Sequence, residues 1–196
     1  MMTSCARPIA VSLAVAALAL GGAPAAAADV YDLDPAHSYA VFQVNHLGFG
    51  TSWGRFNDLS GTFTIDEENP AASSVKIEIK AASVDTNNPQ RDEHLRKPDF
   101  FNAAQFPLIS FKSTSVKKSG ESEYTVGGDL TLRGVTKPLS VTLQRHQTGA
   151  DPWGNTRTGF DTTFLVKRSE FGVSYMPQGL SEEVRVMISV EGIKKK

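Results

Sequence analysis

The sequence predicts an all-β protein whose strands are antiparallel. Three observations lead to this fold class: apolar and polar residues alternate along several short segments, turn residues separate those segments, and only one stretch has helical character. Strict alternation places one face of a strand in the core and the other in water, which is typical of antiparallel sheets. A parallel α/β sheet would instead show continuous apolar runs with helices between them.

The alternating segments follow one another along most of the chain. The pattern is clearest at 74–81, where Val75, Ile77 and Ile79 alternate with charged residues, and it recurs at 39–46, 126–132, 139–143, 158–166 and 184–191. Turn-rich sequences separate these runs at 67–70, 118–120, 133–138 and 151–155. We therefore expect about eight strands, arranged as a sandwich or a barrel, between which alternation alone does not choose.

One segment, 88–104, interrupts the series of strands because it is charged and shows no alternation. Arg91–Lys97 is expected to form a short helix with Leu95 facing inward, and Pro98 would end it. Phe100-Phe101 follows directly. We expect this helical insertion, around residues 89–104, to cap one end of the β-structure.

Residues 1–28 have a different character from the rest of the chain. Arg7 precedes the apolar run Ile9–Leu20, and Ala26–Ala28 supplies small residues suited to cleavage. This order is typical of a secretory signal peptide, and the apolar run is shorter than the roughly 20 residues that span a bilayer. We expect cleavage after Ala28, a single domain at 29–196, location in the periplasm and no integral membrane span.

The residue inventory excludes several classes of function. The one cysteine, Cys5, lies in the expected leader, so residues 29–196 offer no disulfide, no cysteine zinc ligand and no thiol nucleophile. The net charge of −1 gives no indication of a nucleic-acid partner. The four histidines, at 37, 46, 94 and 146, include no pair with the spacing of metal ligands on a helix, so we expect no metal site.

The densest ionisable group is Arg91-Asp92-Glu93-His94. An Asp–His pair could join a serine in a catalytic triad, but the sequence has no Gly-x-Ser-x-Gly elbow, and positions 92 and 94 point away from each other on a helix. We expect a solvated lid helix that Arg91 or Asp92 anchors by ion pairs, and no catalytic residue. The glycine-rich stretch 48–54 lacks the Lys-Ser/Thr of a phosphate-binding loop.

Longer motifs indicate a family. They are DPAHS at 34–38, VNHLGFGTSWGRF at 44–56, GTFTID at 61–66, the segment 82–113 with its RDEHL and DFF sequences, GGDLTLRGVTKP at 127–138 and RSEFGV at 168–173. Over nearly all of 29–196 the chain resembles the YceI-like bacterial periplasmic lipid-binding proteins. The resemblance implies an extended lipocalin-like fold, an eight-stranded antiparallel β-barrel with a helical insertion. It also implies a bound polyisoprenoid, isoprenoid quinone or other long-chain lipid, no required cofactor, and a link to stress responses.

Under this resemblance the eleven phenylalanines become candidates for the lining of an apolar tunnel, whereas composition alone would favour an ordinary core. Strand parity predicts a wall formed by Phe42, Val44, Phe63, Ile109, Phe111, Leu130, Leu132, Phe160 and Phe164. Phe101 and Phe106 would face the tunnel from the insertion, and Phe49, Trp53, Phe171 and Met176 would lie in loops over it. His46, Arg91 and His94 are candidates for the head-group end.

Three functions stay open at this point. The first, which we favour, is binding, storage or transport of a long-chain lipid. The second is an enzyme that modifies such a lipid with the Arg91–His94 group. The third is recruitment of a protein partner at a sheet edge, which a closed barrel does not have. A homodimer that hides the tunnel mouths is also left open.

Overall fold

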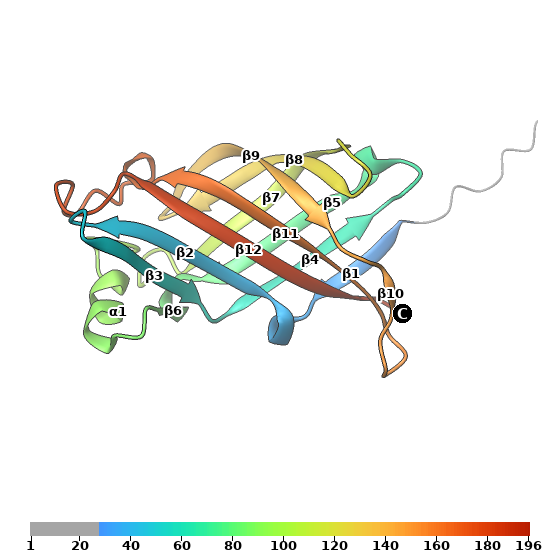
Figure 1. Ribbon diagram of the computed structural model, residues 1–196, viewed down its shortest axis with the longest axis horizontal. Helices are drawn as coiled ribbons and strands as arrows, with labels where there is room; N and C mark the ends of the chain where they lie inside the picture. The colour runs from blue at the N-terminus through green and yellow to red at the C-terminus, as the bar shows by residue number, and fades with distance from the viewer. Residues whose placement is uncertain (1–27) are drawn as a thin grey trace, which may run out of the picture.

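Eight antiparallel strands close into a barrel in the computed structural model, which describes residues 28–196 (Figure 1). β12 (Glu183–Lys194) pairs with β11 (Thr156–Lys167) along its whole length, and β1 (Asp29–Leu33) pairs with the far end of β12. The order from β11 to β1 runs through β9 (Val135–Arg145), β8 (Glu123–Leu132), β7 (Leu108–Lys118), β5 (Ser74–Lys80) and β4 (Leu59–Ile65). This confirms the predicted fold class. The expected signal peptide lies outside the described residues, apart from Ala28, and stays a prediction.

A second group of strands lengthens the wall at one end of the barrel. β2 (Tyr39–His46) pairs with β12, β3 (Gly50–Phe56) pairs with β2, and β6 (Val84–Asp85) pairs with β3. The 3₁₀ turns η1 (Pro35–His37) and η3 (Ala81–Ser83) separate β1 from β2 and β5 from β6. The short elements η2 (Pro70–Ala72), β10 (Gly149–Ala150) and η4 (Arg168–Phe171) complete the chain.

The helix α1 (Pro89–Arg96) forms where the sequence predicts it, two residues earlier than expected at its start. Pro89 suits the first helical position, and the Asn88 side chain accepts a hydrogen bond from the backbone N–H of Arg91 at 3.0 Å. Residues 97–107 form turns and not helix, because Pro98 cannot continue it. The helical part of the predicted insertion is therefore only its first half.

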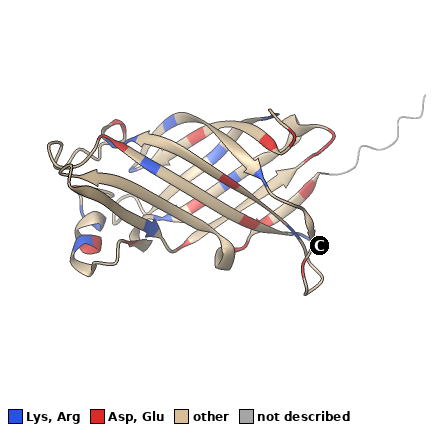
Figure 2. Ribbon diagram, viewed as in Figure 1, with Lys and Arg blue, Asp and Glu red and all other residues tan. Residues whose placement is uncertain are grey.

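The barrel has two different ends. Figure 1 shows α1, the β2–β3 hairpin, the β8–β9 turn and the β11–β12 loop together at one end, which we call the α1 end. The turns after β4 and β7 and the β10–β11 loop lie at the other end, which we call the far end. Basic and acidic residues are both spread along the strands and loops of the whole barrel (Figure 2). Among residues 28–196, no helix combines the length and apolar character needed to cross a membrane.

Candidate functional site

The barrel encloses a cavity of about 520 Å³, within the roughly 300–1,000 Å³ of typical ligand pockets. Inward-facing aliphatic and aromatic side chains from both strand groups form its wall. Of the side chains predicted from the sequence, the cavity is lined by Phe42, Val44, Trp53, Phe63, Phe101, Ile109, Phe111, Leu130, Leu132, Phe160, Phe164 and Met176. His46, Arg91 and His94 also border it. That these residues hold a ligand stays a prediction.

Three predicted lining residues do not line the cavity. Phe49 lies at the tip of the β2–β3 hairpin and is 90% exposed, because the strands end before it. Phe106 packs its ring against Gly134 in the β8–β9 turn. Phe171 is buried within η4, whereas Arg168 and Val173 form the cavity wall on this side.

The prediction also missed much of the wall because it favoured phenylalanine. β12 contributes Val184, Val186, Ile188 and Val190, and β9 contributes Leu139, Val141 and Leu143. Both sets share one parity within alternating segments, so the sequence does carry the signal for them. The prediction also missed Phe56, which lies on the inward parity of β3, two residues after the glycine-rich stretch 48–54.

Two glycines make room for aromatic rings inside the wall. A Cβ on Gly54 would lie 2.2 Å from Cζ of Phe42, and one on Gly128 would lie 2.5 Å from Cζ of Phe111. Each ring therefore covers bare backbone of the neighbouring strand. Phe42 packs further against Phe56, with ring centroids 5.6 Å apart. The sequence feature behind this close approach is a glycine on the inward face.

Stacked aromatic rings close the cavity toward the far end. Tyr31 and Phe63 stack with centroids 5.1 Å apart, and Phe160 meets Phe63 edge to face at 5.4 Å. Tyr124 adds a further edge contact with Phe160. Burial raises the pKa of Tyr31, which keeps this phenol neutral.

Polar lining is concentrated at the α1 end. His46 and Ser52 come from the β2–β3 hairpin, Thr86, Arg91 and His94 from α1 and the segment before it, and Arg168 and Tyr175 from the β11–β12 loop. Among residues 28–196, no aspartate or glutamate lines the cavity. This end therefore presents hydrogen-bond donors and positive charge beside an apolar interior.

The Arg91–His94 group does not form a catalytic pair. The buried Asp92 carboxylate accepts hydrogen bonds from the Thr86 backbone N–H and hydroxyl, and Arg91 donates to the same residue. His94 instead pairs with Asp99 at 3.0 Å and packs edge to face on Phe100 and Tyr175. Hydrogen bonds to Thr86, and not the expected ion pairs, therefore anchor this helix through Arg91 and Asp92. Asp92 and His94 bond to different partners.

Arg168 organises the β11–β12 loop from inside. The residue is 5% exposed, and its guanidinium donates to the carbonyl oxygens of Val173, Tyr175, Leu180 and Ser181. No carboxylate lies within ion-pair distance of it among the described residues. One side chain therefore ties both halves of the loop together and leaves a buried positive charge at the cavity wall.

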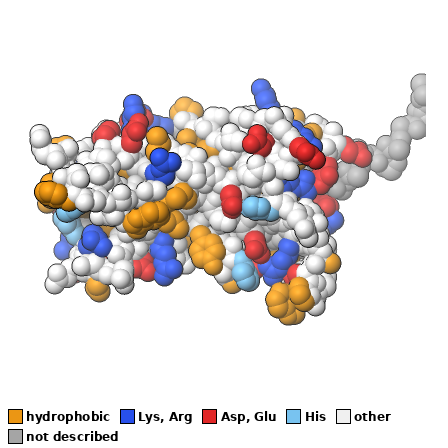
Figure 3. Space-filling model, viewed as in Figure 1, with side chains coloured by type: hydrophobic (Ala, Val, Ile, Leu, Met, Phe, Trp, Pro, Cys, Tyr) orange, Lys and Arg blue, Asp and Glu red, His pale blue; other side chains and the backbone are white. Residues whose placement is uncertain are grey.

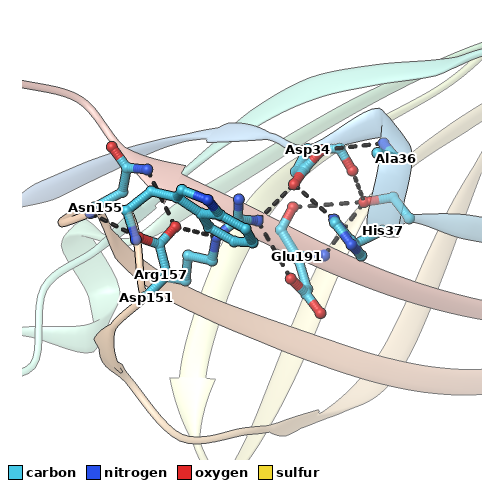
Figure 4. A network of polar contacts seen from close by, with 9 residues as sticks. Asp34, Ala36, His37, Asp151, Asn155, Arg157 and Glu191 are labelled. Carbon is cyan, nitrogen blue, oxygen red and sulfur yellow. Dashed lines mark hydrogen bonds and ion pairs between the residues drawn. The ribbon is translucent and has the colours of Figure 1, made fainter.

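A second polar cluster joins η1, the β10–β11 loop and β12 (Figure 4). Asp34, His37 and Glu191 come close enough to hold a metal ion, but the Arg157 guanidinium bonds to both Asp34, at 2.5 Å, and Glu191, at 3.4 Å. Arg157 also bonds to Asp151 at 2.7 Å. A cation is thus already present, and the cluster is best explained as a structural ion-pair network.

The comparisons with known proteins agree with this geometry. The sequence model of the YceI-like domain matches residues 31–192. The chain belongs to the YceI-like family. It is 44% identical over 185 residues to protein YceI of Escherichia coli O157:H7, covering 94% of this chain and 96% of that protein.

Solved structures share the YceI-like barrel. BcnA of Burkholderia cenocepacia superposes with a TM-score of 0.75 at 24% identity, covering 82% of this chain and 99% of that one. A polyisoprenoid-binding domain from Saccharophagus degradans superposes with a TM-score of 0.64 at 18% identity, covering 84% and 98% of the two chains. At these identities the likeness concerns the fold.

Proposed function

We propose that this YceI-like protein binds a long-chain apolar lipid, of the polyisoprenoid or isoprenoid-quinone class, in the barrel cavity and stores or carries it. The observation that carries the proposal is the apolar cavity, closed by aromatic rings at the far end and bordered by donors at the α1 end. The described function of the Saccharophagus domain supports the ligand class. Export to the periplasm through residues 1–28 and a role in stress responses belong to the same proposal.

The driving force for such binding is removal of the chain from water. Burial recovers roughly 25 cal/mol for each Å² of apolar surface, so a long chain needs few polar contacts for affinity. Length and width of the cavity then select the ligand. Binding of this kind involves no reaction, which fits a site in which Asp92 serves as a helix anchor.

The chemistry of the α1 end indicates which head groups fit. Arg91, His94 and Tyr175 can donate hydrogen bonds, and no carboxylate side chain of the described residues lines the cavity. A head group with oxygen acceptors, such as a quinone carbonyl, a hydroxyl or a phosphate, satisfies these donors. We therefore place the head group at this end and the chain terminus against Phe63 and Phe160.

The proposal is tested by filling the cavity with protein side chain. Val186→Trp adds a large ring on the inward face of β12, and Leu165→Trp adds the same ring on the outer face of the adjacent strand β11. Protein purified from bacteria is extracted with organic solvent, and lipid per protein is quantified by mass spectrometry. We expect one lipid class near stoichiometric amount in wild type and Leu165→Trp, and a large loss in Val186→Trp.

Circular dichroism and thermal unfolding establish that both variants keep the barrel. Wild-type protein that is reproducibly empty would overturn the proposal. Equal lipid content in a folded Val186→Trp variant would place the lipid elsewhere on the protein and would equally count against it.

A further inference from the structure

The β2–β3 hairpin and the β11–β12 loop are joined into one unit at the α1 end. We call residues 45–50 and 173–181 the lip. The backbone N–H of Leu47 donates to the carbonyl of Gly179 at 2.8 Å, and that of Ser181 donates to the carbonyl of Asn45 at 3.1 Å. An isolated bridge between His46 and Leu180 adds to these contacts. The two segments therefore present their side chains as one surface.

The lip exposes large apolar side chains at its outer edge. Leu47, Phe49, Tyr175 and Met176 are all exposed, Phe49 most of all. Figure 3 shows hydrophobic side chains at the surface of this end of the molecule, as elsewhere on the same face. Tight turns of this kind ordinarily carry asparagine, aspartate and glycine, so an apolar outer edge is unusual.

Backbone strain indicates that these residues are not chosen for stability. Leu47 and Met176 adopt the left-handed conformation, with φ of 53° and 52°, which L-residues other than asparagine and aspartate rarely adopt. Leu47 is 47% exposed and Met176 is 38% exposed, so each gains only part of the burial that could offset this cost. Strained, apolar and exposed residues together point to a role at an interface.

The lip is continuous with the cavity. Tyr175, Met176, Leu180 and His46 belong both to the lip and to the cavity wall. Any apolar chain that leaves the cavity at the α1 end therefore passes these side chains first. Water is a poor medium for that transfer, and a bilayer offers an apolar phase in contact with the lip.

Positive charge without carboxylate partners lies around the lip. Arg91, Arg133 and Arg168 donate to carbonyl and hydroxyl oxygens, and none has a carboxylate within ion-pair distance in the described part of the chain. Arg91 is exposed and Arg133 is half-buried, so these two cations can meet anionic head groups, whereas Arg168 is buried. A second copy of the same lip would bring only the same positive charges.

We propose that the lip docks on the surface of an anionic lipid bilayer, with Phe49 and Leu47 inserted among the acyl chains, so that the cavity opens toward the membrane. This inference rests on the proposed lipid-carrying function. Apolar and aromatic side chains of amphipathic membrane-binding segments enter the boundary between head groups and acyl chains in the same way.

Fluorescence quenching tests the docking directly. The chain has two tryptophans, Trp53 and Trp153. F49W in a background carrying Trp53→Phe and Trp153→Phe places the only indole at the lip, and Trp53→Phe alone leaves the only indole at Trp153, in the loop at the far end. Vesicles of phosphatidylglycerol and phosphatidylcholine brominated on the acyl chains should quench the first protein and leave the second unquenched.

Vesicle co-sedimentation adds a matched pair of variants. Phe49→Ser should reduce the vesicle-bound fraction by about tenfold, because it removes one inserted aromatic side chain. Trp153→Ser, which removes an exposed aromatic at the far end, should leave it unchanged. Binding should fall when phosphatidylglycerol is replaced by phosphatidylcholine.

Two results would overturn the inference. One is absent or equal quenching of the two reporters. The other is a dimer by light scattering that Phe49→Ser dissociates while vesicles leave the protein free, which would assign the lip to a second copy of the chain. The lipid content of the same preparations distinguishes failure of this inference from failure of the proposed function. Wild-type protein that contains lipid but does not bind vesicles would contradict only the docking of the lip. Wild-type protein that contains no lipid would contradict the proposed lipid-carrying function.

Discussion

At the scale of single residues, Arg157 connects chain segments that are far apart in the sequence. It bonds to Asp34, Asp151 and Glu191, and its guanidinium lies 5.9 Å from the centroid of the Trp153 ring. The hydrogen bond from Arg157 lowers the pKa of Asp34 to about 2. The same guanidinium holds the pKa of Asp151 well below its usual range.

These pKa shifts determine whether the stability of the fold rises or falls with pH. Because the pKa of Asp34 is lower in the folded state than its ordinary value of 3.8, the stabilisation is present above that value and is lost as the pH falls toward about 2. Urea unfolding of the wild type should therefore show falling stability over this acidic window.

Arg157→Met should lower the free energy of unfolding at pH 7 by about 3 kcal/mol, the lower end of the range for breaking a buried pair, because Arg157 is partly exposed. Acid unfolding should begin at a higher pH, since the pKa of Asp34 rises without its cation. Arg55→Met removes the exposed ion pair with Asp85 and serves as the control with a much smaller effect. An equal decrease in the free energy of unfolding in the two variants would contradict the role given to Arg157.

At the scale of elements, strand β3 offers a comparison within seven residues. Gly54 faces inward beneath the ring of Phe42, while a Cβ on Gly50 would meet nothing within 4 Å. Gly54→Ala should destabilise the protein by about 1–3 kcal/mol, as overpacking does, and Gly50→Ala should not.

The same two variants should also differ in the amount of lipid that they retain. The new methyl group would push the Phe42 ring toward the cavity that this ring lines. Gly54→Ala should therefore retain less lipid than Gly50→Ala when both are extracted and quantified by mass spectrometry. Unchanged stability together with unchanged lipid in Gly54→Ala would contradict the account of this wall.

The individual elements also show what alternation can and cannot predict. Strand β2 spans Tyr39–His46, as predicted, and its inward parity places Phe42 and Val44 on the cavity wall. Period-two alternation ends with the strand, so side chains in turns cannot be placed by parity. Phe49 and Phe106 were misplaced for this reason.

At the scale of the whole molecule, the barrel and its helical insertion follow from alternation, turn residues and family motifs. Contacts between distant segments do not, because no local pattern records them. Arg157 reaches Asp34 across 123 positions, and Leu47 bonds to Gly179 in another loop. Both ends of the cavity depend on such contacts. The cavity wall was therefore largely predictable from the sequence, whereas the ends of the cavity were not.

The central claim is that a lipid chain occupies the barrel cavity. A crystal structure of the protein as purified from bacteria, without added ligand, tests this most directly. The account predicts continuous elongated electron density from Phe63 and Phe160 to the α1 end, with the head group beside Arg91, His94 or Tyr175. A cavity containing only ordered water, or one filled by inward movement of its own side chains, would contradict it.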